Sequence, residues 1–159
     1  MTGTQGRTVV VGLDATVEGL SALRWAMREA ASRNASLEVV HCWQPETLTD
    51  LALGTPHELS RASICMVDNE VRAAVAEMDN APKVIQTSIH GRTATTLINR
   101  AAHAELLVLG AHGHTTMHDR MFGKVGQSCI KHAACPVVVI DAEQNASTYD
   151  GGRIPVTTG

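Results

Sequence analysis

Glycines and a cationic side chain gather in one segment of the chain, residues 110–128. Gly110, Gly113 and Gly123 punctuate this segment, and a helical pattern with Lys124 in its first turn follows. Glycine lets a backbone approach an anion closely, and a helix N-terminus offers unpaired N–H groups and a partial positive charge. The segment is therefore a candidate phosphate site.

The spacing of these glycines differs from that of a P-loop. Gly123 and Lys124 are followed by Val125 where a P-loop has Ser or Thr, and no second glycine stands five residues before Gly123. Glycines before a helix are also explained by turn formation alone. The residues by themselves leave both interpretations open.

Asp14 is a second candidate, because it follows the apolar run of residues 8–13 directly. A carboxylate there could accept hydrogen bonds from a ribose hydroxyl. An aspartate at such a position also commonly caps a helix or a turn by accepting from nearby backbone N–H groups. The spacing favours neither role over the other.

Neither a metal site nor a catalytic site is expected. His112, His114 and His118 lie close together, but no cysteine or acidic pair completes a familiar ligand spacing, so exposed imidazoles are the simpler interpretation. His114 would titrate near neutrality and add positive charge to a phosphate site at lower pH. Ser128 and His132 share a helix face but lack an orienting acid and an oxyanion motif.

The elements that position these residues alternate along the chain. Apolar positions at three- and four-residue spacing predict helices between short runs that are typical of strands buried on both faces. This order indicates an α/β domain with a parallel sheet and right-handed crossovers. Ligands of such sheets bind at the carboxyl ends of the strands, where Asp14 and the glycine segment stand. The predicted strands are residues 8–13, 36–41, 83–89, 106–109 and 136–140.

Composition excludes several classes of protein. The 159 residues are 44% hydrophobic, which is enough for one domain with an aliphatic core. A net charge of −3 and an aromatic content of 3% argue against a nucleic-acid-binding surface. No apolar run approaches the ~20 residues of a membrane span. We see no basic, apolar leader and no C-x-x-C pair, so we expect a cytoplasmic protein with reduced thiols.

Over residues 7–141 the whole pattern resembles the universal stress protein family. The family's nucleotide-binding motif is G-x2-G-x9-G-[ST], and Gly110, Gly113 and Gly123 stand at its three glycine positions. Asp14 closes the first strand, as in the family. The combined match is specific because both the spacing and the order of these features agree.

The resemblance implies a five-stranded parallel open sheet in the order 3-2-1-4-5, with helices on both faces, as in adenine nucleotide alpha hydrolase-like folds. It places the family domain at 7–141 and leaves an N-terminal extension at 1–6. Residues 142–159 are polar and rich in Gly and Thr, so we expect a flexible C-terminal tail that is disordered or is ordered only against a partner. The resemblance also implies a homodimer formed through the last strand, from Pro136 to Asp141, which would cover an apolar edge.

The implied ligand is an adenine nucleotide, with ATP first and ADP or AMP as alternatives, and Mg²⁺ accompanying it. Asp14 would contact the ribose, and the backbone of His41 or Cys42 would contact adenine. Lys124 replaces the motif's final Ser or Thr, which puts ATP affinity in question, although a lysine could contact phosphate by a charge-assisted bond. The implied binding residues are Gly12, Asp14, His41, Cys42, Gly110, Gly113, His114, Gly123, Lys124 and Val125.

The resemblance favours a regulatory stress-response protein that binds an adenine nucleotide and catalyses little. One alternative is a dimeric stress protein that binds no nucleotide and acts through protein contacts; Lys124 favours it, whereas the three retained glycines oppose it. A second alternative is a slow ATPase, for which Asp14 and Lys124 are the only candidate contributors.

Overall fold

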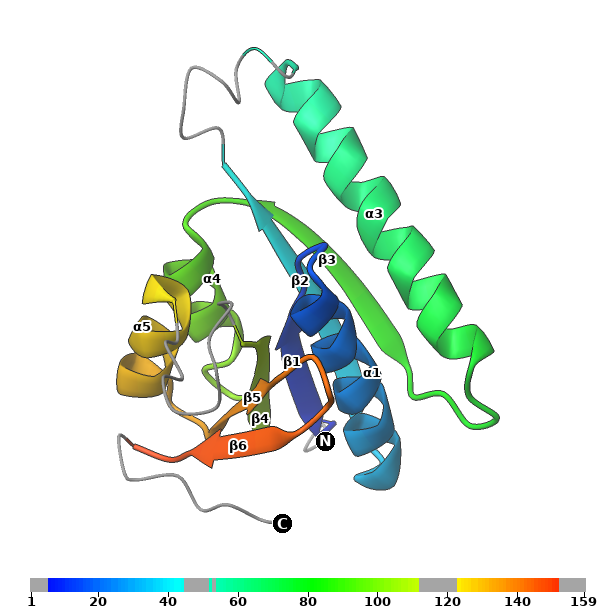
Figure 1. Cartoon of the computed structure of the whole chain (residues 1–159), viewed down its shortest axis with the longest axis vertical. Helices are drawn as coiled ribbons and strands as arrows, with labels where there is room; N and C mark the ends of the chain where they lie inside the picture. Colours follow the sequence, from blue (N-terminus) through cyan, green and yellow to red (C-terminus); the bar gives the residue numbers. More distant parts are fainter. Residues whose placement is uncertain (1–5, 45–51, 53, 112–122, 152–159) are drawn as a thin grey trace, which may run out of the picture.

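The computed structural model describes residues 6–44, 52, 54–111 and 123–151. Strands and helices alternate through most of this part of the chain (Figure 1). The elements are β1 (Thr8–Gly12), α1 (Val17–Ser32), β2 (Ser36–Trp43), α3 (Pro56–Ala76), β3 (Val84–His90), α4 (Thr93–Arg100), β4 (Leu106–Gly110), α5 (Lys124–His132), β5 (Val137–Ile140) and β6 (Ala146–Tyr149).

One sheet of six strands, in the order β3-β2-β1-β4-β5-β6, organises the molecule. The first five strands pair in parallel, so the order 3-2-1-4-5 expected from the sequence is confirmed. The strand order reverses between the neighbouring strands β1 and β4: from β1 the chain adds β2 and β3 on one side, and from β4 it adds β5 and β6 on the other. Their carboxyl ends therefore form the edge where a ligand of this fold is expected.

The sixth strand corrects the expectation of five. β6 pairs with β5 in antiparallel fashion and lies in the segment that the sequence analysis assigns to a flexible tail from residue 142. The Asp141 carboxylate accepts from the backbone N–H of Asn145 at 2.8 Å and from its side-chain amide at 2.9 Å, and Gln144 adopts a φ of 66°. These contacts close a tight turn. The polar β6 sequence gives no apolar run by which to recognise a strand.

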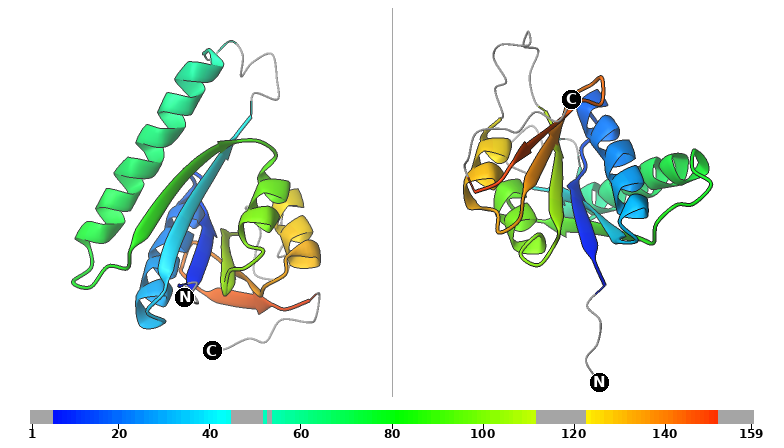
Figure 2. Two further views of the ribbon diagram at one scale, coloured as in Figure 1. Left: turned by 180° about the vertical axis from the view of Figure 1, so that it is seen from behind. Right: turned by 90° about the horizontal axis from the view of Figure 1, so that it is seen from below.

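Helices cover both faces of the sheet (Figure 2), and a buried cluster lies on each face. Val9 and Val11 of β1 are fully buried in a cluster with α1 and α3. Val10 between them is fully buried in a second cluster, with α4 and α5. Because both faces of β1 are buried, its sequence is a continuous apolar run. No helix in the described ranges is long and apolar enough to cross a membrane.

An ion pair between a buried glutamate and a partly exposed arginine joins α4 to the sheet. Glu38 of β2 lies on the α4 side with only 9% of its side chain exposed, and it accepts from Nε of Arg100 at 2.7 Å. The hydroxyl of Thr87 in β3 donates to the same carboxylate at 2.9 Å. A charge in the middle of a strand is tolerated here because both partners donate to it. The pair sets where the C-terminal end of α4 lies.

Candidate functional site

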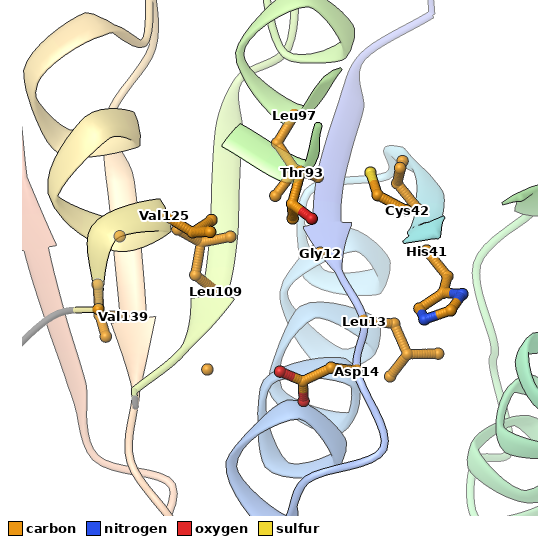
Figure 3. Close-up of a pocket in the computed structure, with 14 residues that line it drawn as sticks. Gly12, Leu13, Asp14, His41, Cys42, Thr93, Leu97, Leu109, Val125 and Val139 are labelled. Carbon is orange, nitrogen blue, oxygen red and sulfur yellow. The ribbon is translucent and has the colours of Figure 1, made fainter. Parts of the chain in front are cut away.

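A pocket opens at the carboxyl edge of the sheet, between the ends of β1 and β4 (Figure 3). Its volume is about 170 Å³. In Figure 3, Val125 and Val139 lie on the opposite side of Gly12 from His41 and Cys42. The lining residues come from six strands and helices, from the turn after β1 and from the N-cap of α5, and they are Gly12, Leu13, Asp14, Val40, His41, Cys42, Thr93, Leu97, Leu109, Gly110, Gly123, Val125, Gly126 and Val139.

Asp14 lines this pocket and also organises the start of α1. Its Oδ1 accepts from the backbone N–H of Thr16 at 3.1 Å and from the hydroxyl of Thr16. The Thr16 hydroxyl oxygen in turn accepts from the N–H of Gly19 at 3.0 Å, which makes Thr16 the N-cap of α1. The local turn role foreseen for Asp14 is therefore present, and it fixes the carboxylate at the rim of the pocket.

Close packing explains three glycines around the site: leucine side chains lie against Gly12, and main-chain atoms lie against Gly19 and Gly110. A Cβ added at Gly12 would lie 2.9 Å from Cδ1 of Leu97, and one added at Gly19 would lie 2.1 Å from Oδ1 of Asp14. A Cβ at Gly110 would lie 2.7 Å from the carbonyl carbon of Glu18. The first glycine of the motif is thus required by the contact between β4 and α1, whatever the pocket binds.

His41 and Cys42 are consecutive in β2 and point to opposite faces of the sheet, as strand geometry requires. Nδ1 of His41 forms a hydrogen bond with Oγ of Ser63 in α3 at 2.6 Å, and that hydroxyl pairs with Oγ of Ser88 in β3 at 2.6 Å. Burial lowers the pKa of His41, and the charge of Asp14 opposes this effect in part. The imidazole is therefore neutral at neutral pH.

Cys42 lies on the other face, half-buried against α4. Burial raises the pKa of its thiol, while a hydrogen bond with Thr96 lowers it in part. Burial also raises the pKa of Cys129 to about 11. All four cysteines are free. Protonated, partly buried thiols are poor nucleophiles, so Cys42 is a wall of the pocket and not an activated group.

The N-terminus of α5 faces the same pocket. Gly123 is the N-cap, and no side chain of the described residues caps this helix. Val125 and Gly126 in the first turn line the pocket, whereas Lys124 is exposed and is not among the lining residues. The N–H groups of this first turn, which no side chain in the described ranges caps, are the donors that an anion at the pocket mouth would meet.

The structure brings together most of the predicted site. Gly12, Asp14, His41, Cys42, Gly110, Gly123 and Val125 all line one pocket. Gly113 and His114 lie outside the described residues, as do His112 and His118. Within the part of the chain that the structure describes, no group of three or more His, Cys, Asp or Glu side chains could hold a metal ion.

Sequence reasoning missed the apolar wall of the pocket. Thr93 and Leu97 come from α4, and Leu109 and Val139 come from β4 and β5. Leu97 belongs to an apolar stripe that predicts a core position, and it is indeed 1% exposed. A stripe residue that packs against a ligand and one that packs against the sheet have the same spacing. No signal in the sequence separates the two.

The fold and site define a doubly wound α/β protein with a small, partly apolar pocket at the point where the strand order reverses. The model of the universal stress protein family matches residues 6–141. The chain belongs to the universal stress protein family.

The curated relatives carry the same family name. Universal stress protein Rv2623 of Mycobacterium tuberculosis is 28% identical over 163 residues, which cover 99% of this chain and 54% of the relative. A universal stress protein of Mycolicibacterium smegmatis is 28% identical over 159 residues, covering 95% of this chain and 53% of the relative. The chain thus spans about half the length of the curated relatives that it matches.

Solved structures agree with the fold. UspA from Lactobacillus plantarum superposes with a TM-score of 0.66 at 22% identity, covering 86% of this chain and 98% of that one. A universal stress protein in complex with cAMP superposes with a TM-score of 0.62 at 24% identity, covering 86% of this chain and 98% of that one. A family protein from Arabidopsis thaliana with AMP bound superposes with a TM-score of 0.57 at 16% identity, covering 85% of this chain and 91% of that one.

Proposed function

We propose that the chain binds an adenine nucleotide in the pocket at the carboxyl ends of β1 and β4. The observation that carries this proposal is the convergence of Asp14, His41, Gly110 and Gly123 on one cavity, although they lie far apart in the sequence. A hydrogen-bonding carboxylate, close-packed backbone and an uncapped helix N-terminus meet there. These are the groups that a sugar hydroxyl and a phosphate require.

The size of the cavity suggests how the nucleotide lies. A volume of about 170 Å³ is below the ~300 Å³ or more of pockets that enclose a whole drug-sized ligand. It suits one ring system against the apolar wall of Leu97, Leu109 and Val139. The phosphates would then extend past Gly110 and Gly123 toward the first turn of α5, where N–H groups and the helix dipole favour negative charge.

Structural neighbours support the ligand class. Two of them are described in complex with cAMP and with AMP. ATP is our first candidate for this chain, with ADP or AMP next and Mg²⁺ accompanying the phosphates. Lys124 replaces the motif's hydroxyl but is exposed at the start of α5. Its flexible side chain could reach a terminal phosphate as a cation.

We further propose that the protein acts in the cytoplasm as a stress-response regulator that binds its nucleotide without turning it over rapidly. Among the described residues that line the pocket, Asp14 and His41 are the only titratable oxygen or nitrogen groups. Both are engaged, Asp14 with Thr16 and His41 with Ser63. Phosphoryl transfer needs a positioned nucleophile and charge stabilisation beyond these two.

The test is to denature freshly purified protein, identify any released nucleotide by mass, and titrate ATP, ADP and AMP by calorimetry. Gly126→Leu should abolish binding, because Gly126 lines the pocket and a leucine there would fill it. Lys131→Leu is the matched control, since it places the same side chain at an exposed position of the same helix. No released nucleotide and no binding by the unaltered chain would refute the proposal.

A further inference from the structure

The sheet ends in β3 on one side and in β6 on the other. β6 pairs with β5 over the whole length of that strand, so the edge of β5 that the family resemblance assigns to a homodimer is already paired within the chain. β3 differs, because among the described residues it pairs with β2 alone. Its seven residues, Val84–His90, include no proline, lysine, arginine, aspartate or glutamate, the residues that protect an edge strand from association.

Alternate residues of β3 direct their backbone groups away from β2. The carbonyl of Lys83 accepts from the N–H of Leu37 at 2.8 Å, and the N–H of Gly91 donates to the carbonyl of Trp43 at 3.1 Å. The odd-numbered residues of this stretch therefore face β2, and residues 84, 86, 88 and 90 direct their N–H and C=O groups outward. A partner strand can pair with these outward groups without displacing any hydrogen bond between β2 and β3.

Exposed apolar side chains border the same edge. Ile85 of β3 is 39% exposed, and Ile64 and Val75 of α3 are 53% and 36% exposed. α3 runs along β3 (Figure 1), and the side-chain amide of Gln86 in β3 donates to the carboxylate of Asp68 in α3 at 3.4 Å. Ile64 and Val75 stand four residues before and seven residues after Asp68, which puts all three on one flank of the helix. The opposite flank of α3 is ion-paired with α1, so the flank with Ile64 and Val75 faces outward beside the edge of β3.

A second copy of the chain fits this edge through its own β3. With a two-fold axis at Thr87, an antiparallel ladder sets Ile85 opposite the partner's Ile89 and Gln86 opposite the partner's Ser88. The outward-facing residues then form the hydrogen-bonded pairs, and the isoleucines and Thr87 form the closer pairs between them. Paired threonines stabilise adjoining strands, and Ile85 is withdrawn from water. No acidic side chain, lysine or arginine lies on β3, so this register brings no such like charges together.

We propose that β3 is a dimerisation edge, through which two copies of this chain pair in antiparallel fashion about a two-fold axis at Thr87 and join their sheets into one. The two copies of α3 lie on the same face of the joined sheet, and the flanks that carry Ile64 and Val75 are turned toward each other. The dimer thus covers the exposed apolar side chains of both elements. The inference does not depend on nucleotide binding, because no residue of β3 lines the pocket.

The first test measures mass by analytical ultracentrifugation between ~1 and ~100 µM, the range over which mass action separates a weak dimer from a monomer. The unaltered chain should sediment as a dimer at the upper end. Gln86→Pro removes an outward N–H that the sheet itself does not use and should give a monomer, whereas Gln86→Ala keeps that N–H and should dimerise. Ile85→Lys should also give a monomer; Val17→Lys makes the same change of charge at an exposed apolar residue of α1 and should not. A monomeric unaltered chain at ~100 µM, or a dimer that persists in either folded edge variant, would overturn the proposal.

A second test uses disulfide cross-linking to examine the register, in a Cys65→Ser chain that lacks the exposed thiol. Thr87→Cys places two thiols at the two-fold axis, where the Cα atoms of such a pair lie about 4.5 Å apart and within reach of a disulfide. Ile85→Cys is the matched control, because its two copies lie ~13 Å apart along the ladder. Oxidation in air should link Thr87→Cys chains into dimers and leave Ile85→Cys chains unlinked. Equal cross-linking of the two variants, or none in a Thr87→Cys chain that sediments as a dimer, would contradict the proposal.

Discussion

The backbone of Gly110, at the end of β4, packs directly on the backbone of Gly19 in the first turn of α1. A Cβ added at Gly110 would lie 2.8 Å from the peptide nitrogen of Gly19, closer than real Cβ contacts come. The obstacle is main chain and cannot rotate away. The first glycine of the family motif therefore serves the packing of β4 on α1 in addition to any role at the phosphates.

Gly110→Ala should consequently destabilise the protein even when no nucleotide is present. Overpacking of this kind costs about 1–3 kcal/mol of unfolding free energy. The measurement is urea unfolding of nucleotide-free protein. Gly6→Ala is the control, because a Cβ there has no atom within 4 Å. Equal stability of Gly110→Ala and the unaltered chain would show that β4 and α1 can move apart without cost.

Thr16→Ala should weaken both the fold and the pocket. Thr16 is the N-cap of α1 and its hydroxyl also donates to Asp14 at the pocket rim, so its loss removes about 1 kcal/mol of stability and leaves Oδ1 of Asp14 with one donor fewer, the backbone N–H of residue 16 being kept. Urea unfolding and nucleotide calorimetry measure the two effects. Thr16→Ser keeps the hydroxyl and should restore both; a serine variant as impaired as the alanine variant would argue against the capping role.

The ion pair of Glu38 and Arg100 should respond unequally to the loss of each partner. Arg100→Leu leaves a buried carboxylate to which, among the described residues, the Thr87 hydroxyl still donates, whereas Glu38→Leu leaves an arginine whose side chain is 43% exposed and can turn to water. An uncompensated buried group costs about 1–3 kcal/mol. Arg100→Leu should therefore be the less stable variant by roughly that amount. Thermal and urea unfolding of the two variants measure the difference. Equal losses of unfolding free energy in both variants would mean that Glu38 reaches solvent when Arg100 is absent.

His41 should make the fold more stable as pH rises from acid toward neutrality. Burial holds its pKa below the usual 6.5, so between the two values the unfolded chain binds a proton that the folded chain does not. The contribution is complete above the unfolded pKa and is lost as pH falls through the folded one. Unfolding free energies from pH ~5 to ~7.5 measure it, and a nuclear magnetic resonance titration of the imidazole gives the folded pKa directly.

His41→Gln should flatten this dependence, because glutamine carries no titrating group. His103→Gln, at an exposed position, is the matched control. A titration midpoint of His41 above 6.5 would contradict the expected direction and would mean that the charge of Asp14 outweighs burial.

The sequence predicts much of the fold because each strand and helix of a parallel sheet has a local pattern of apolar residues. Strands buried on both faces are short apolar runs, such as the β4 sequence Leu-Leu-Val-Leu-Gly, and the helices between them carry apolar stripes. Alternation predicted the parallel sheet, whereas the order of β1 to β5 within it was implied by the family resemblance. The polar β6 had no such local mark, because its pairing with β5, and not its own composition, makes it a strand of the sheet.

The candidate site divides in the same way. Residue types and spacing alone identified Asp14 and the glycine segment, since a carboxylate after a strand and glycines before a helix have local chemical meaning. Only the tertiary structure placed Leu97 of α4 in the pocket wall, joined His41 to Ser63 and Ser88, and pressed Gly110 onto α1. Each of these contacts joins residues distant in the chain, and their distances depend on how the sheet twists and how the helices pack on it.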